Sequence, residues 1–172
     1  MDTKTLVVLD APWEADGVKP LDDTAALIFV RAHDDVSAVL VGYLLVIEKR
    51  RPDAKFKMPG GHRQPGEYPT QTAARELVGE TGLDLPLSAF TYVNSEWRDA
   101  RPPRSLRGHW SMLFVADINE KEDVPWMSSL HRENEGEEPK FFRLAEFARL
   151  VQGDGLLRSH FVRLKEAKLI GM

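Results

Sequence analysis

Several short apolar runs, rich in β-branched residues, are spread along the chain and predict β-strands. Residues 24–32 (TAALIFVRA) and 38–49 (AVLVGYLLVIEK) have the length and composition of buried strands. Gly42 inside the second run predicts a kink. Two later stretches, 87–97 and 108–118, are also strand-like and are separated by a polar loop. The pattern therefore predicts a sheet built from both halves of the chain.

A helix is predicted from Pro69 to about Thr81. Proline suits a first helical turn, where its missing N–H costs little, and Gly82 suits the left-handed position just past the end. At 100° per residue, one apolar stripe should pack on the sheet. The stripe consists of Ala73, Ala74, Leu77 and Val78.

The end of the chain also has helical periodicity. We predict one helix over residues 144–151 and another over residues 156–170, where Leu157, Phe161, Leu164 and Lys168 recur at helical spacing. Strands followed and interrupted by helices indicate a mixed sheet with helices on its faces. The expected fold class is therefore α/β or α+β, in a single domain over residues 1–172.

Composition narrows the functional classes. The 172 residues are 42% hydrophobic and 29% charged, which is typical of one soluble domain, and the formal net charge is −4. A net negative charge does not indicate an extended basic surface for binding a nucleic-acid duplex. The absence of cysteine excludes a disulfide scaffold, a thiolate zinc site and a cysteine nucleophile. Without a signal-peptide pattern or a run of ~18–20 apolar residues, we expect a cytoplasmic protein with no membrane partner.

Acidic residues on the predicted helix are candidates for metal binding. Glu76 and Glu80 lie four positions apart and therefore share a face. Their carboxylates repel each other unless a cation lies between them, and oxygen-rich sites of this kind suit Mg²⁺ or Mn²⁺. The turn at Gly60 and Gly61 lets backbone atoms come close to a ligand. Taken alone, however, such a pair is more often a solvated helix face.

The complete spacing around these acids is more specific. It reads Gly, five residues, Glu, seven residues, Arg-Glu-apolar, then Glu-any-Gly-apolar. This pattern resembles the Nudix box, the signature of hydrolases of nucleoside diphosphates linked to another moiety. The positions that match, over residues 61–83, are Gly61, Glu67, Arg75, Glu76, Leu77, Glu80, Gly82 and Leu83.

The resemblance implies a Nudix-type α/β/α sandwich with a mixed sheet and a divalent metal, Mg²⁺ or Mn²⁺. It implies Glu76 and Glu80 as metal ligands and catalytic residues, and Glu67 as an accessory ligand, directly or through water. The carbonyl of Gly61 is a further candidate ligand. Arg75 is expected to pair with a box glutamate and orient it. The implied reaction is pyrophosphate hydrolysis, with the metal polarising a phosphoryl oxygen.

Gly79 departs from the pattern, because the family has a glutamate at this position. It lies about 60° around the helix from Glu76, so a carboxylate here would border the same cluster. A helix-interior glycine also costs about 0.5–1 kcal/mol relative to alanine. The change indicates either altered or weakened metal binding, or else tolerated drift or close packing at this position. An alternative function is therefore a Nudix-fold nucleotide-binding or regulatory module with little or no turnover.

The residue that activates water is left open by the sequence. Glu76 is one candidate. The other is an acid in the distal segment HRENEGEEPKFF, whose glutamates are Glu133, Glu135, Glu137 and Glu138. Glu135 is the first choice that the resemblance implies, because it precedes the strand-like KFF by the margin at which the family's loop acid often lies. The competing interpretation is an exposed acidic loop.

The loop between the later strands carries Arg98, Arg101, Arg104 and Arg107 at intervals of three. The first three are candidates for binding substrate phosphates, against the alternative of a solvated loop. Trp97 and Trp110 flank the loop and could stack a base, although core packing is commoner. The expected partner is a small nucleoside diphosphate derivative of unspecified type. The resemblance leaves a homodimer open, because many relatives dimerise.

Overall fold

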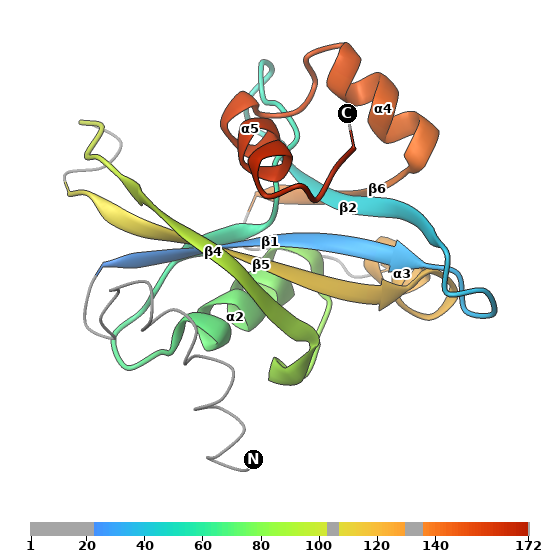
Figure 1. The fold of residues 1–172 in the computed structure, drawn as a ribbon, viewed down its shortest axis with the longest axis horizontal. Coiled ribbons are helices and arrows are strands. Elements are labelled where there is room, and N and C mark those ends of the chain that lie inside the picture. Colours follow the sequence, from blue (N-terminus) through green and yellow to red (C-terminus); the bar gives the residue numbers. More distant parts are fainter. Residues whose placement is uncertain (1–22, 103–106, 130–135, 172) are drawn as a thin grey trace.

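The computed structural model describes residues 23–102, 107–129 and 136–171. Its strands and helices are interspersed along the chain (Figure 1). The strands are β1 (Thr24–His33), β2 (Leu40–Glu48), β3 (Gly60–His62), β4 (Phe90–Arg98), β5 (His109–Asn119) and β6 (Glu137–Arg143). The helices are α2 (Pro69–Thr81), the short 3₁₀ helix η1 (Leu87–Ala89), α3 (Glu120–Ser129), α4 (Leu144–Gln152) and α5 (Arg158–Glu166).

The six strands form one mixed sheet in the order β4-β5-β1-β2-β6, with β3 paired to β1. The parallel pair is β1 with β5, whereas β4–β5, β1–β2 and β2–β6 are antiparallel. Strand β1 changes partner along its length. Residues Ala25 to Leu27 pair with β3, and Val30 to His33 pair with β2. The segment leading into β3 is thereby inserted between β1 and β2.

The helices form a layer on each face of the sheet, with α2 on one side and α4 and α5 on the other (Figure 1). Side chains alternate along β1, so Ile28 packs toward α2 and Phe29 packs toward α4 and α5. Leu77 anchors α2 in the first core, and Leu164 anchors α5 in the second. The expected mixed sheet with helices on its faces is confirmed.

Helix α2 begins and ends where the sequence predicts. Gly82 has φ 76°, and its N–H donates to the carbonyl of Val78 at 2.8 Å. The predicted apolar stripe is only partly right, because Val78 is 41% exposed. The buried face is instead centred on Ala73, Leu77 and Glu80. Glu80 therefore points into the protein rather than flanking the packed stripe.

Two other segments differ from the sequence prediction. Helix α3 was not predicted, although Asn119 marks its start by accepting bonds from the N–H groups of Lys121 and Glu122 at 3.0 and 3.1 Å. Helix α5 stops at Glu166, and its buried face includes His160 and Arg163 besides apolar residues. The pattern of apolar residues did not indicate that His160 and Arg163 are buried, because burial of a polar side chain depends on partners from distant segments.

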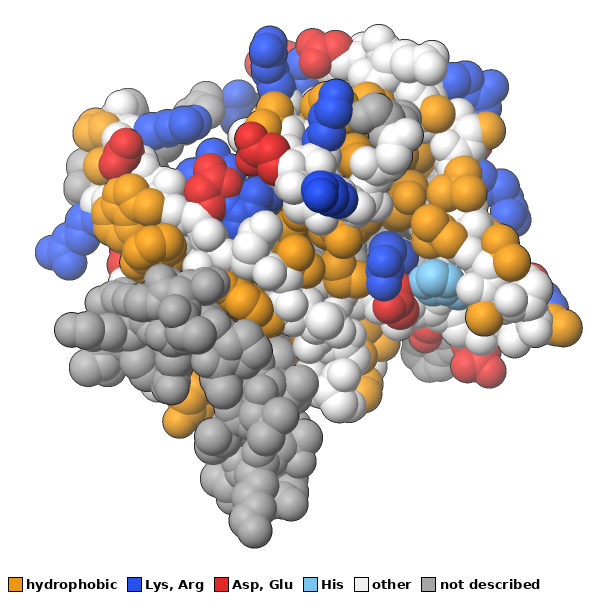
Figure 2. Space-filling model, viewed as in Figure 1, with side chains coloured by type: hydrophobic (Ala, Val, Ile, Leu, Met, Phe, Trp, Pro, Cys, Tyr) orange, Lys and Arg blue, Asp and Glu red, His pale blue; other side chains and the backbone are white. Residues whose placement is uncertain are grey.

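Gly42 permits close approach of neighbouring strands. A Cβ atom built there would lie 2.3 Å from the carbonyl oxygen of Phe142 in β6. Strand register also shifts nearby, between Ala32 and His33 of β1, which agrees with the predicted kink. The surface over α4 and α5 mixes acidic and basic side chains (Figure 2). Among the described residues, no helix is long and apolar enough to cross a bilayer.

His160 joins α5 to the segment before β3. Its Nδ1 accepts a hydrogen bond from the N–H of Met58 at 2.9 Å, which fixes the neutral ring with its proton on Nε2. Burial, helped by the nearby charge of Lys57, lowers the pKa of His160 to about 4. The folded protein therefore resists protonation of this ring at a pH where the unfolded chain accepts it.

Acid should destabilise the protein through His160. Between pH ~6.5 and about 4 the unfolded state binds the extra proton, so the free energy of unfolding falls as pH falls, by up to ~3 kcal/mol. Urea unfolding between pH 8 and 4 measures this. His160→Asn keeps an acceptor near the Met58 N–H but does not titrate, so its stability should fall less across the window. An identical pH dependence in both proteins would contradict this role.

Candidate functional site

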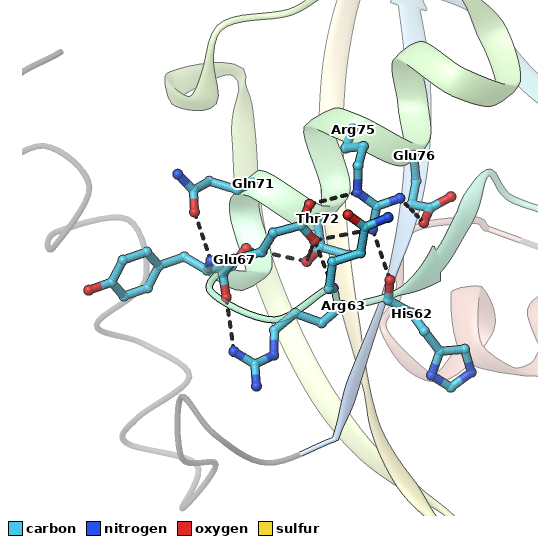
Figure 3. Close-up of polar contacts among 9 residues, drawn as sticks. His62, Arg63, Glu67, Gln71, Thr72, Arg75 and Glu76 are labelled. Carbon is cyan, nitrogen blue, oxygen red and sulfur yellow. Dashed lines mark hydrogen bonds and ion pairs between the residues drawn. The ribbon is translucent and has the colours of Figure 1, made fainter.

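Arg75 of α2 organises the polar residues of the loop–helix segment (Figure 3). Its Nε donates to Glu67 Oε1 at 2.6 Å, and its Nη1 donates to Glu76 Oε1 at 2.5 Å. Its Nη2 donates to the carbonyl of His62 at 2.9 Å. The fork of one guanidinium thus links the two acids and the end of β3. The expectation that Arg75 pairs with a glutamate of the segment agrees with this geometry.

Glu67 is held on several sides. Besides Arg75, its Oε2 accepts bonds from the N–H of Gln64 and the hydroxyl of Thr72, both at 3.0 Å. The hydrogen bond from Arg75 is the main cause that lowers the pKa of Glu67. An ionised carboxylate with these donors fixes the loop before α2. Its role as an accessory metal ligand stays a prediction, and the occupied oxygens favour contact through water.

Glu76 packs directly against the glycine turn. A Cβ atom on Gly61 would lie 2.5 Å from Glu76 Oε1, so only glycine lets β3 approach this carboxylate so closely. The side chain of Glu76 is 14% exposed. Glu76 and Gly61 are therefore adjacent, as their assignment to one metal site requires, although the assignment itself stays a prediction.

Glu80 lies deeper than Glu76. It is 5% exposed, and its Oε2 accepts a hydrogen bond from the N–H of Gly60 at 2.8 Å. Burial, together with the adjacent carboxylate of Glu137, raises the pKa of Glu80 to about 10. Because Lys57 balances the charge of Glu137 and Glu80 is the more deeply buried of the two, the proton stays on Glu80 at neutral pH.

Glu137 comes from the distal acidic segment and begins β6. Pairing of β6 with β2 places it opposite Glu48, and its carboxylate forms an ion pair with Lys57. Its Oε2 is buried and has no hydrogen-bond partner among the described residues. The acid that we chose from this segment, Glu135, lies outside the described residues. The alternation along β6 was the signal that could have favoured Glu137.

A cavity of about 370 Å³ opens beside these acids, on the side of the sheet that carries α5. Gly60 and Gly61 form part of its wall, so the same turn separates the cavity from Glu76 and Glu80. Most of its other lining groups are polar or basic. They are Lys57, His62, Arg98, Asp99, Arg101, His109, Ser111, Ser159 and His160, of which Asp99 is acidic.

The arginine loop reaches this cavity through two of its members. Arg98 and Arg101 line the cavity, whereas Arg104 lies outside the described residues. The rings of Trp97 and Trp110 meet edge to face, with centroids 5.6 Å apart. Trp97 is 49% exposed, so it is not a core residue. The role of the arginines in substrate binding stays a prediction.

The donor chemistry of the site suits a hard divalent cation. Within the described part of the chain, no three His, Cys, Asp or Glu side chains converge as they would around a bound ion. Glu80 and Glu137 nevertheless form a buried pair of acids, and Glu137 Oε2 lacks a hydrogen-bond donor. Carboxylate and backbone oxygens are the ligands that Mg²⁺ and Mn²⁺ prefer. The residues present therefore fit the metal implied by the box.

Comparison with known families agrees with this arrangement. The family model described as NUDIX domain matches residues 22–161. The chain belongs to the Nudix family. The match includes the box, the cavity-lining arginines Arg98 and Arg101, and the first turn of α5. The recognition made from residues 61–83 is thus confirmed, together with the mixed α and β architecture.

Solved structures of other Nudix proteins share the fold of this Nudix chain. A mutT/nudix family protein from Listeria innocua has 21% identity and a TM-score of 0.56, with 87% of this chain and 93% of that chain covered. The NUDIX domain of Shewanella oneidensis NrtR, complexed with ADP ribose, has 16% identity and a TM-score of 0.59, with 96% of this chain and 97% of that chain covered. Shewanella oneidensis NrtR complexed with a 27mer DNA has 18% identity and a TM-score of 0.59, with 84% of this chain and 59% of that chain covered.

Proposed function

We propose that this Nudix chain is a divalent-metal-dependent pyrophosphohydrolase that cleaves a nucleoside diphosphate linked to another moiety. The observation that carries the proposal is the buried Glu80–Glu137 pair beside the glycine turn of a basic cavity. A pair of acids attracts a cation, and basic side chains attract an anion. A diphosphate with its bound metal ion supplies both the anion and the cation that such a site attracts.

The proposed roles follow from the position of each side chain. Glu80, Glu137 and Glu76, with the carbonyl of Gly61, would hold Mg²⁺ or Mn²⁺. When bound, the ion supplies charge neutralisation and polarisation of a phosphoryl oxygen. Glu76 is held in place by Arg75, so it is also placed to accept a proton from water near the glycine turn.

The basic residues of the cavity would receive the substrate. Arg98 and Arg101 would contact phosphate oxygens, and guanidinium groups can do so with two donors at once. ADP-ribose, the ligand of the NrtR domain described above, has a diphosphate between two sugars and is therefore a suitable first probe. Nucleotide sugars, nucleoside triphosphates and dinucleoside polyphosphates belong to the same chemical class.

A nucleotide panel tests this proposal directly. We expect hydrolysis of at least one diphosphate-linked compound with Mg²⁺ or Mn²⁺ and none with excess EDTA. ³¹P NMR of the products identifies the broken bond, which should lie within the diphosphate. Turnover that persists at full rate in EDTA would contradict the metal requirement.

Gly79 supports a second candidate, a nucleotide-binding or regulatory module. The position on α2 where the family carries a further acid has no side chain here, which removes one carboxylate from the edge of the cluster. The same panel separates the two functions if binding is measured by calorimetry alongside hydrolysis. Tight binding of a nucleotide without any turnover, in either metal, would favour the module.

A further inference from the structure

Arg163 of α5 is a cation buried beneath the cavity wall. It is 2% exposed, and its Nη2 donates to the carbonyl of Ser111 at 2.8 Å and to that of Asn94 at 3.3 Å. Its Nη1 forms an ion pair with Glu96 Oε2. These contacts connect α5 with β4 and β5. A buried guanidinium requires such a carboxylate, because an unpaired charge in the interior is costly.

Glu96 is shared between two arginines. While Oε2 faces Arg163, its Oε1 lies 3.2 Å from Nη2 of Arg98. Arg98 is 24% exposed at the side chain and lines the cavity. The trio thus contains two positive charges and one negative charge, and Arg98 is its member that lines the cavity, next to Asp99.

This arrangement determines how much of Arg98 a ligand can use. Without Arg163, both oxygens of Glu96 could turn to Arg98, and the two side chains would form a neutral two-pronged pair. With Arg163 holding Oε2, Glu96 offers Arg98 one oxygen only. Arg98 then keeps donors and net charge for an anion in the cavity.

We infer that Arg163 is a positioning residue that keeps Arg98 available to an anionic group, specifically a phosphate of the proposed nucleoside diphosphate substrate. This inference rests on the proposed function for the identity of the ligand. The electrostatic effect of Arg98 on two histidines that line the cavity agrees with this inference. Burial is the largest cause that lowers the pKa of His109 and of His160, and the charge of Arg98 is a smaller contribution to both.

A set of variants separates this role from simple attachment of α5. Arg163→Met should release Glu96 onto Arg98 and weaken ADP-ribose binding about tenfold, the scale of one charge-assisted hydrogen bond. The double variant R163M/E96Q removes the competing carboxylate as well, so binding should return to within about twofold of wild type. Arg158→Met removes an exposed arginine from the same helix and is the matched control. Calorimetry at low salt measures all four proteins.

A measurement without ligand tests Arg98 itself. Phenylglyoxal modifies accessible guanidinium groups, and peptide mapping by mass spectrometry follows Arg98 alone. Its modification should be slower in Arg163→Met than in wild type and should recover in R163M/E96Q. If Arg163→Met does not fold, Arg163→Lys keeps the charge beside Glu96, and Arg98 should then react nearly as in wild type.

The possible outcomes are distinct. A double variant that binds as weakly as Arg163→Met, with equal Arg98 reactivity in all proteins, would show that Arg163 only attaches α5. Slow Arg98 modification in Arg163→Lys would also overturn the inference. If no protein binds ADP-ribose but the reactivity pattern is as expected, the positioning role stands and the proposed ligand is wrong.

Discussion

Replacing Glu80 with Gln is expected to lower kcat by more than about a hundredfold while leaving the fold intact. Even the residues that support metal ligands cost about 10–100-fold when changed, and Glu80 is proposed as a ligand itself. The amide oxygen of Gln can still accept the bond from the Gly60 N–H that Glu80 Oε2 now accepts. Glutamine also resembles the protonated state of Glu80 in the metal-free protein.

Steady-state kinetics over a range of Mg²⁺ concentrations, with thermal unfolding of both proteins, measures this effect. The apparent Mg²⁺ affinity should fall together with kcat, because loss of a charged ligand affects both. A well-folded Glu80→Gln protein with undiminished activity would remove Glu80 from the metal site. Glu122→Gln, an exposed change on α3, is a suitable control for handling and folding.

Glu137→Gln is expected to lower kcat by about a hundredfold. Its carboxylate adjoins Glu80 and pairs with Lys57 through Oε1, while its buried Oε2 has no hydrogen-bond partner among the described residues and is open to a metal ion. An amide in this place would bring N–H donors instead of charge. Mn²⁺ binding, followed by electron paramagnetic resonance, should weaken in the same variant without any need for turnover.

The neighbouring residue provides the control for Glu137. Glu138 is 60% exposed and forms an ion pair with Lys49 at the surface, so Glu138→Gln should leave kcat and Mn²⁺ binding unchanged. Glu135→Gln belongs in the same series, since the sequence favoured Glu135. Loss of activity in Glu135→Gln but not in Glu137→Gln would show that Glu135, and not Glu137, is the functional acid of this segment.

The sequence predicted the elements that depend on local chemistry. Pro69 and Gly82 bound helix α2 as expected, because helix termini are fixed by the residues that occupy them. Apolar runs predicted β1 and β2 for a similar reason, since buried strands need continuous apolar side chains. Pairing of Arg75 with a box glutamate was also correct, as both lie within one short segment.

Features that depend on distant pairing were beyond sequence analysis. Four glutamates lie in the distal segment, and only the register of β6 against β2 brings Glu137 to Glu80. Arg163 is a second case. Helical counting treats it as a surface residue, but its carboxylate partner lies 67 positions away in β4. Buried polar side chains of this kind are specified by tertiary contacts.

The segment inserted between β1 and β2 has a consequence for how phosphate can be recognised. The N–H groups of Lys57, Met58 and Gly60 are already bonded, to the carbonyl of Val46, the ring of His160 and the carboxylate of Glu80. Pro59 has no N–H to offer. Glycine-rich loops commonly cradle phosphate with free backbone amides. From residue 57 to residue 60 this wall has no free backbone N–H, so an anion bound along it must be recognised by side chains that line the cavity, such as Lys57, Arg98 and Arg101.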